Sequence, residues 1–158
     1  MSVEIERKFL VQPHLLPTFR DEERMYQGYL VTGPTSLRIR LSQPSGQAQV
    51  AWLVVKGPGT IQRPEFHLEL PVDLAKSLLS GCSSIISKTR YLYGRWEVDR
   101  FHNVLDVVAN DSLWLAEIEL ESLDEPIAIP EWCGQEVTED VSFSNAQLAT
   151  RTTFRPNI

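Results

Sequence analysis

The sequence predicts a mainly β fold with a few peripheral helices, and three observations support this. Eight segments of the 158-residue chain show the alternation or the β-branched and aromatic composition that is typical of strands. Turn sequences such as Pro44-Ser45-Gly46 separate several of them. Helical patterns are few and short. With 42% hydrophobic and 23% charged residues, the chain is expected to fold as one domain over residues 1–158.

The predicted strands follow one another with short connections. In the first, VEIERKFLV, apolar side chains alternate with Glu4, Glu6 and Lys8. Two carboxylates and an ammonium therefore share one face of this strand. The eight segments are 3–11, 25–32, 36–42, 48–56, 63–70, 87–94, 95–101 and 113–121.

Three short helices are predicted between or after these strands. Residues 13–23 have room for a turn or two. Over 73–81, three leucines fall on one helical face, Asp73 is placed to cap the helix and Gly81 to end it. Near the chain end, 144–152 reads as a short helix capped by Ser144 or Asn145.

The charged residues of six strands fall on one face of each strand. A solvated outer face of a half-buried sheet is the default interpretation for any single strand. Such faces usually mix Thr, Ser, Gln and Lys, whereas these carry mainly Glu, Asp, Arg and Lys. The alternative is a closed barrel whose charged face points inward, where there is room for side chains or one small ligand. Besides Glu4, Glu6 and Lys8, the residues on these charged strand faces include Arg38, Arg40, Arg63, Glu65, His67, Glu69, Lys88, Arg90, Glu97, Asp99, Glu117 and Glu119.

A charged interior suits a particular chemistry. Dry paired charges in a barrel would be costly, but a wet lumen holding an anion and metal ions would be favourable. Arginine binds phosphate oxygens through its bidentate fork, and carboxylates bind hard cations such as Mg²⁺. The pattern therefore points to a site that handles polyphosphate.

Composition and motifs exclude several other classes. The net charge of −6 argues against nonspecific nucleic-acid binding. Cys82 and Cys133 form no metal or redox motif and suit a reducing cytosol. No signal-peptide pattern and no apolar run of membrane-spanning length is present, so we expect a cytoplasmic protein. Gly57-Pro58-Gly59 lacks the other residues of a phosphate-binding loop, and no nucleophile motif occurs.

Nine segments in order along the chain carry a resemblance to a known family. They are EIERK (4–8), QGYL (27–30), LRIR (37–40), KG (56–57), RPE (63–65), KTRY (88–91), EVD (97–99), EIELES (117–122) and EWCGQEVTED (131–140). Together they resemble the CYTH domain, whose members are also called triphosphate tunnel metalloenzymes. The last segment is especially similar to the short bacterial members.

The resemblance implies a closed eight-stranded antiparallel β-barrel around a charged tunnel, and hydrolysis or cyclisation of triphosphates with Mg²⁺ or Mn²⁺. It implies direct attack of water on a terminal phosphorus, without a covalent enzyme intermediate. Lys88 is the candidate for the group that activates the water. The implied metal ligands are Glu4, Glu6, Glu117 and Glu119, with Glu65 and Asp99 or Glu97 completing or supporting them; the implied phosphate ligands are Lys8, Arg38, Arg40, Lys56, Lys88 and Arg90.

Two positions depart from the family pattern. Where the family often has Glu-x-Glu, this chain has Glu65-Phe66-His67, and imidazole is a poorer partner for Mg²⁺ than for Mn²⁺. After Asp140, where a basic residue and Tyr are common, Val141, Ser142 and Phe143 follow. These changes bear on efficiency and metal preference more than on fold.

Several functions stay open at this level. Hydrolysis of inorganic tripolyphosphate to pyrophosphate and phosphate is the first reading, since the short chain leaves little provision for recognising a base or a sugar. A class IV-type adenylate cyclase and a thiamine triphosphatase are alternatives, as is a non-catalytic module that binds polyphosphate or nucleotide. The expected partner is a small triphosphate, with no nucleic acid or membrane, and a homodimer is possible.

Overall fold

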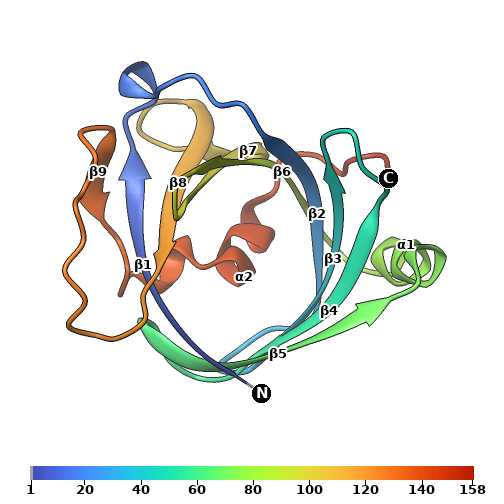
Figure 1. Ribbon diagram of the computed structural model, residues 1–158. Helices are drawn as coiled ribbons and strands as arrows, with labels where there is room; N and C mark the ends of the chain where they lie inside the picture. Colours follow the sequence, from blue (N-terminus) through green and yellow to red (C-terminus); the bar gives the residue numbers. More distant parts are fainter. Residues whose placement is uncertain (1) are drawn as a thin grey trace.

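The computed structural model describes residues 2–158 as a closed antiparallel β-barrel with short helices (Figure 1). The sheet order is β5-β4-β3-β2-β6-β7-β8-β1, and β1 pairs again with β5 to close the ring. The barrel strands are β1 (Ser2–Val11), β2 (Glu22–Val31), β3 (Ser36–Pro44), β4 (Val50–Lys56), β5 (Gln62–Leu70), β6 (Ile85–Tyr93), β7 (Trp96–Asp106) and β8 (Asp111–Glu119). All eight predicted strands are confirmed.

Short elements connect or follow these strands. They are α1 (Val72–Ser80), α2 (Asn145–Leu148), and the 3₁₀ turns η1 (Pro13–Leu15), η2 (Val141–Phe143) and η3 (Ala149–Arg151). A short additional strand, β9 (Cys133–Glu136), pairs with the C-terminal end of β1, at Phe9 and Val11. This strand was not predicted. Within residues 2–158, no helix combines the length and apolar character that crossing a bilayer requires.

The helix caps differ in part from the prediction. Asp73 was expected to cap α1, but Pro71 is the N-cap and no side chain bonds there. The N-cap therefore lies two positions earlier than expected, which places Asp73 in the first turn, where its charge favours the helix dipole. Gly81 ends α1, and Ser144 caps α2 by accepting from the Gln147 amide at 3.2 Å, both as predicted.

Strand β1 closes the barrel by pairing with two neighbours in succession. Its first part pairs with β5, from Ser2 opposite Glu65 to Ile5 opposite Gln62. Its second part pairs with β8, from Glu6 opposite Glu119 to Leu10 opposite Leu115. The acidic residues of β1 therefore lie at the seam where the two ends of the sheet meet.

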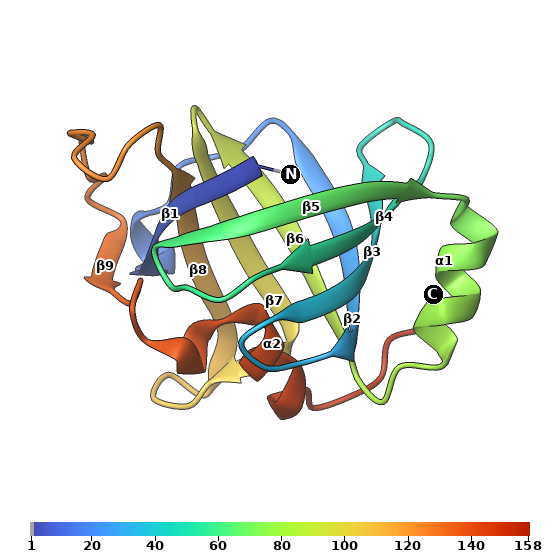
Figure 2. The same ribbon diagram turned by 90° about the horizontal axis from the view of Figure 1, so that it is seen from below.

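The outer face of the barrel is apolar and is covered by chain segments. Helix α1 packs outside β3 and β4, with Ala75 and Leu79 against Ile39 and Leu41 (Figure 2). Gly28 on β2 permits this approach, because a Cβ there would lie 2.7 Å from the Cys82 sulfur. A second outer cluster centres on the aromatic rings of Phe9, Trp96 and Trp132, whose edge-to-face pairs have centroids 5.6 Å apart.

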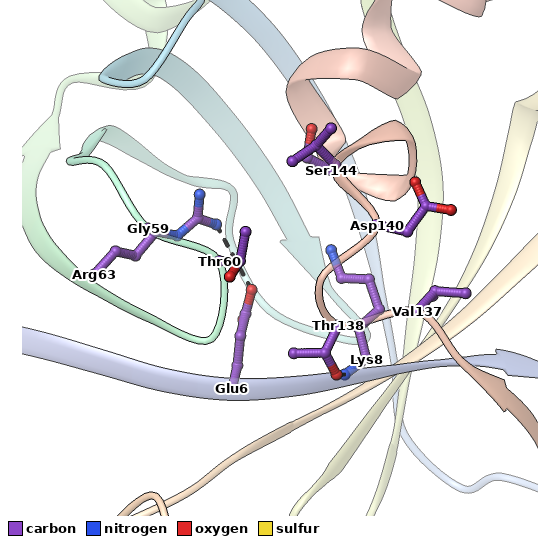
Figure 3. A pocket seen from close by; sticks show the side chains of 10 residues that line it. Glu6, Lys8, Gly59, Thr60, Arg63, Val137, Thr138, Asp140 and Ser144 are labelled. Carbon is purple, nitrogen blue, oxygen red and sulfur yellow. Dashed lines mark hydrogen bonds and ion pairs between the residues drawn. The ribbon is translucent and has the colours of Figure 1, made fainter.

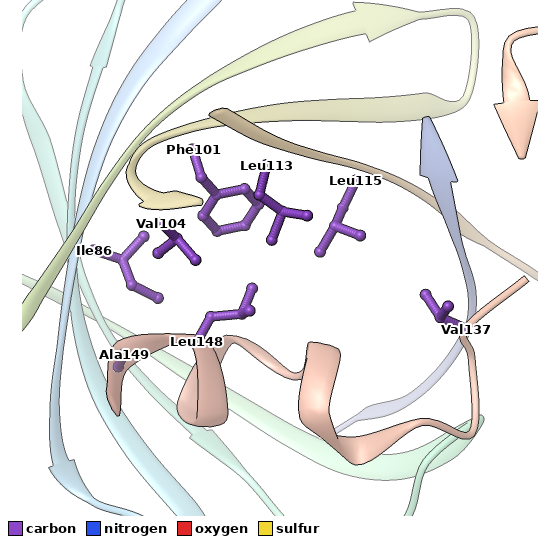
Figure 4. Close-up of a cluster of buried hydrophobic side chains, with 8 residues drawn as sticks. All are labelled: Ile86, Phe101, Val104, Leu113, Leu115, Val137, Leu148 and Ala149. Carbon is purple, nitrogen blue, oxygen red and sulfur yellow. The ribbon is translucent and has the colours of Figure 1, made fainter. Parts of the chain in front are cut away.

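One end of the barrel interior is also apolar, which charge patterning alone did not predict. Leu148 and Ala149, from α2 and η3, face inward-pointing side chains of β6, β7 and β8 (Figure 4). Most of these side chains share parity with the charged residues of the same strands, and Val104 lies within the irregular part of β7 between Arg100 and Leu105. The cluster comprises Ile86, Phe101, Val104, Leu113, Leu115, Val137, Leu148 and Ala149. The C-terminal segment thus fills one end of the interior and leaves the charged part beside it.

Candidate functional site

The charged faces of the strands point into the barrel. Lys88 is fully buried, and Lys8, Arg38, Lys56, Arg90, Asp99 and Glu117 are each less than a tenth exposed. Their ion pairs join strands that are distant in sequence, such as β1 with β4 and β1 with β8. The solvated-face interpretation is therefore wrong, and the barrel interpretation is confirmed.

The deepest ion pairs are centred on Asp99. Lys88 Nζ donates to Asp99 Oδ2 at 2.5 Å, and Arg90 donates from Nε and Nη2 at 2.7 and 2.8 Å. Burial would raise the pKa of Asp99, but Arg90 and Lys88 outweigh it and hold that pKa below its usual value. Burial lowers the pKa of Lys88 to about 8, although Asp99 opposes the shift. Asp99 therefore fixes two cations rather than standing free for another ligand.

A second group lies at the seam between β1, β4 and β5. Glu4 accepts from Lys56 Nζ at 2.7 and 2.9 Å and from Arg63 Nε at 3.4 Å. Glu65 lies 3.7 Å from Lys56 Nζ and 2.6 Å from the His67 Nε2. The imidazole that replaces a family carboxylate is thus a partner of Glu65, and together with Lys56 it lowers the pKa of Glu65 against the effect of burial.

Lys8 and Glu117 form a third pair across β1 and β8. Lys8 Nζ lies 3.0 Å from Glu117 Oε1, and Arg90 Nη2 lies 3.7 Å from its other oxygen. Burial would raise the pKa of Glu117, but Lys8, Arg90 and Lys88 outweigh it and hold the pKa well below its usual value. Glu117 is therefore ionised within the basic part of the interior.

Arg38 and Arg40 on β3 are cations without carboxylate partners. Among the described residues, neither guanidinium forms an ion pair, and the Nε of each is buried without a hydrogen bond. Arg38 Nη1 donates only to the Tyr29 hydroxyl, at 3.4 Å. Burial, then repulsion from Arg38 and Arg90, lowers the pKa of Arg40 to about 10. Such uncompensated cations create a site for an anion.

Carboxylates meet in like-charged pairs on the neighbouring strands. Glu6 lies directly opposite Glu119 in the β1–β8 register, and Glu97 lies opposite Glu117 in the β7–β8 register. Like charges directly opposite one another destabilise a sheet unless a cation lies near them. Burial, reinforced by Glu117, raises the pKa of Glu6 to about 7 against the opposing effects of Lys56 and Lys8, and Arg63 Nη2 lies 3.6 Å from the Glu6 carboxylate.

These carboxylates supply the oxygen donors that Mg²⁺ and Mn²⁺ prefer. Within residues 2–158, no three acidic, His or Cys side chains already converge as a metal cage, because basic side chains hold several of the carboxylates. The opposed pair of Glu6 and Glu119, with Glu117 and Glu4 nearby, nevertheless fits a divalent cation, since neither Glu6 nor Glu119 is hydrogen-bonded to a cationic side chain among the described residues. Asp99 is separate from this group and bonded to Lys88 and Arg90.

Solvent reaches the charged interior beside the loop between β4 and β5. Figure 3 shows Glu6, Lys8 and Arg63 pointing into a pocket of about 50 Å³ between this loop and the segment that includes Asp140. It shares Gly59, Thr60 and Arg63 with a larger cavity of about 490 Å³ that reaches Arg38, Lys56 and α2. A third hollow, of about 350 Å³, lies beside Arg90 where β2 begins and β3 ends.

Some site residues were given no role by the sequence. Arg63, one of the charged positions picked out by parity, pairs with both Glu4 and Glu6. Tyr29 contacts Arg38 and lines the larger cavity. Glu119, a predicted candidate, is exposed at the end of β8.

The unusual sequence after Asp140 forms a local turn. The Asp140 carboxylate accepts from the Ser142 amide at 3.0 Å and from its hydroxyl at 2.7 Å. Lys8 Nζ donates to the Phe143 carbonyl at 3.3 Å. The Asp140 carboxylate thus bonds Ser142, and the Lys8 bond to Phe143 holds the segment just before α2 against β1.

The raised pKa of Glu6 predicts a pH-dependent stability in metal-free buffer. With a folded pKa of about 7 and an ordinary value of 4.5, the folded protein keeps a proton that the unfolded chain loses, so stability falls as pH rises between these values. Glu6→Gln has no carboxylate to titrate, so its stability should not fall in this way. The difference in free energy of unfolding between Glu6→Gln and the unsubstituted protein should therefore grow by up to about 3 kcal/mol between about pH 5 and pH 8. Urea unfolding in EDTA measures it.

Glu136→Gln is the matched control for this prediction. Arg7 donates to Glu136 at 2.8 Å on the outer face and lowers the pKa of that carboxyl. The control should therefore lose stability relative to the unsubstituted protein as pH rises. Equal pH profiles for Glu6→Gln and the unsubstituted protein would contradict the raised pKa.

Comparisons with known proteins agree with this geometry. Residues 2–153 match the family model of the CYTH domain. An inorganic triphosphatase of Acetivibrio thermocellus is 34% identical over 94% of each chain, and one of Nitrosomonas europaea is 36% identical over 92% of this chain and 96% of its own. The crystal structure of an inorganic triphosphatase aligns with a TM-score of 0.60 at 30% identity, covering 94% of this chain and 95% of its own. The chain belongs to the CYTH domain family.

Proposed function

We propose that the protein is an inorganic triphosphatase that hydrolyses tripolyphosphate to pyrophosphate and orthophosphate, acting as one domain over residues 1–158. The carrying observation is the pair of arginines without carboxylate partners, Arg38 and Arg40, whose Nε atoms are buried in a barrel that also holds opposed glutamates. An anion site and a cation site thus adjoin within one enclosed space. The relatives named inorganic triphosphatase support this choice of substrate.

The phosphate chain would bind along the basic side chains of several strands. Arg38 and Arg40 have free donors for phosphate oxygens, and guanidinium suits bidentate contact with them. Arg90 is held by Asp99, so its orientation is set before substrate arrives. Lys8, Lys56 and Lys88 complete the proposed basic set.

A divalent metal would be held by Glu4, Glu6, Glu117 and Glu119, with Glu65 beside Glu4. When bound, it would neutralise charge that develops on the phosphate oxygens. Glu6 and Glu119 are the most available ligands, since neither has a hydrogen-bonded cationic partner among the described residues. Glu4 and Glu117 would exchange part of their contact with Lys56 and Lys8 for the metal. Asp99 is assigned the role of orienting Lys88 and Arg90.

The reaction forms one bond from water oxygen to the terminal phosphorus and breaks the bond from that phosphorus to the bridging oxygen. The bridging oxygen leaves with pyrophosphate, and a proton is lost from water. Lys88 is the candidate to receive that proton. Burial lowers its pKa to about 8, so near that pH a fraction of the molecules carries Lys88 as a neutral amine. Arg40 and Arg90 would stabilise the charge on the transferred group.

A substrate panel tests the proposal. Tripolyphosphate, thiamine triphosphate and ATP are each incubated with Mg²⁺ and with Mn²⁺, and orthophosphate and cyclic AMP are measured. Tripolyphosphate should have the highest kcat/KM, with one orthophosphate released per substrate. Cyclic AMP from ATP would identify a cyclase instead, and binding of tripolyphosphate without turnover would identify a binding module.

Arg40→Ala should raise the KM for tripolyphosphate at least about tenfold, since a charge-assisted contact contributes roughly 1.5–3 kcal/mol. Steady-state kinetics at saturating metal measure the change. Arg24→Ala, an exposed arginine on the outer face of β2 beside Tyr26, is the matched control and should leave KM unchanged. Equal KM values for Arg40→Ala and Arg24→Ala would remove Arg40 from the site.

A further inference from the structure

Gln27 is a buried polar residue that the ion-pair network does not use. It has no exposed surface, and neither its Nε2 nor its Oε1 has a hydrogen-bond partner among the described residues. Burying both polar ends of a carboxamide without partners is unfavourable, so such groups usually bond water or a ligand. Gln27 therefore marks a place where a polar molecule is expected.

The side chain of Gln27 points into the barrel. Alternate residues of β2 share a face, and Tyr29 on the face of Gln27 reaches inward to Arg38. Gly28, between them, lies on the outer face under α1, as its close approach to Cys82 requires. The carboxamide is thus directed into the interior rather than toward the helix.

The neighbours of Gln27 belong to the anion site. Its register partner on β3 is Arg40, and Arg38 is the partner of Tyr29, two residues along. The Nε of Arg40 is buried and lacks a partner, like the Gln27 carboxamide. On β6 the partner of Gln27 is Ile86, which offers no polar group. Two unsatisfied side chains therefore lie side by side, one cationic and one neutral.

We propose that Gln27 binds substrate at this position: its Nε2 donates to an oxygen of the phosphate group held by Arg40, and its Oε1 accepts from an ordered water. This inference rests on the proposed function. A neutral donor adds no charge to a region that already contains Arg38, Arg40 and Arg90. Its contribution is directional, so it fixes where the phosphate group sits and adds little to general attraction of anions.

The test uses Gln27→Met, which keeps the length of the side chain and removes both polar groups. In EDTA, calorimetric titration of the full chain with tripolyphosphate should give a Kd about tenfold weaker than that of the unsubstituted protein. In the presence of Mg²⁺, KM should rise by a similar factor with a smaller change in kcat. The Tm without ligand should be unchanged or higher, because an unsatisfied buried carboxamide has been removed.

Ser87→Ala is the matched control. The Ser87 hydroxyl is also buried without a partner, but its parity on β6 is opposite to that of Lys88, and it faces away from the interior. Its removal should leave Kd and KM unchanged. Gln27→Glu is the second variant: a carboxylate beside Arg40 should raise the Tm and weaken tripolyphosphate binding by more than Gln27→Met does.

The outcomes separate the two proposals. If Gln27→Met has the same Kd and KM for tripolyphosphate as the unsubstituted protein, the proposed role of Gln27 is overturned. The triphosphatase assignment is not affected by that result. A lowered Tm with unchanged binding would show that Gln27 is a structural residue bonded to an internal water. Failure of the unsubstituted protein to bind or hydrolyse tripolyphosphate would overturn both proposals. If Gln27→Met does not fold, undiminished binding in Gln27→Glu overturns the inference.

Discussion

Glu6→Gln is expected to reduce metal-dependent hydrolysis of tripolyphosphate by roughly 10³-fold, because a lost metal contact removes several kcal/mol of transition-state stabilisation. Glu6 lies opposite Glu119 and near Glu117, where the excess negative charge favours a cation. Glutamine keeps the size of the side chain and removes its charge. Initial rates over a range of Mg²⁺ and Mn²⁺ concentrations measure the effect.

The loss of activity can be separated from a loss of folding. Glu6→Gln should be at least as stable as the unsubstituted protein at neutral pH, because burial disfavours the ionised carboxylate there. Glu136→Gln, which removes a carboxylate from the outer face, should keep its activity. Full activity of Glu6→Gln at every metal concentration would contradict its assignment as a ligand.

Asp99→Asn is expected to destabilise the protein by about 3–5 kcal/mol, the usual cost of removing one partner from a buried ion pair. Asp99 is 1% exposed and accepts from both Lys88 and Arg90. Asparagine preserves the shape of the side chain, leaves the buried Lys88 without an ion-pair partner, and leaves Arg90 with only Glu97 and Glu117. Urea unfolding at neutral pH measures the difference.

A double variant tests the electrostatic origin of that loss. Lys88→Met combined with Asp99→Asn removes the cation that the single variant leaves without a partner and should recover part of the stability. The single Lys88→Met variant completes the double-mutant cycle. A stability loss below about 1 kcal/mol for Asp99→Asn would mean that solvent reaches Lys88 and Arg90, as it does for surface ion pairs.

Side-chain parity predicted that the charges of each strand share one face, but it left open whether that face points to solvent or into a barrel. Arg38 and Arg40 alternate with apolar residues that pack on the outside, and on β6 Lys88 and Arg90 alternate with Ser87, Thr89 and Tyr91. Alternation is a local property of a strand, so the sequence displays it directly. The resemblance then predicted barrel closure, which depends on the long-range pairing of β1 with β5.

Other features depended on neighbours that alternation does not reveal. Asp99 resembled a metal ligand by type and parity, but its partners across the register are cations. Gln27 is uncharged, so the pattern of charged strand faces does not include it. Strand β9 is four residues long, and it forms because β1 offers it a free edge. The apolar end of the interior arises where α2 enters, at positions such as Ile86 and Leu115.

The pairing of β1 has a consequence for synthesis on the ribosome. This strand precedes every strand that it pairs with, and its partner β8 ends at Glu119. During translation β5 can pair with Ser2 to Ile5 early, but the part of β1 from Glu6 to Leu10 stays unpaired with β8 until most of the nascent chain has emerged, so the seam is completed late. The charged face of β1, Glu4, Glu6 and Lys8, then serves a second purpose, because charges along an open edge discourage aggregation.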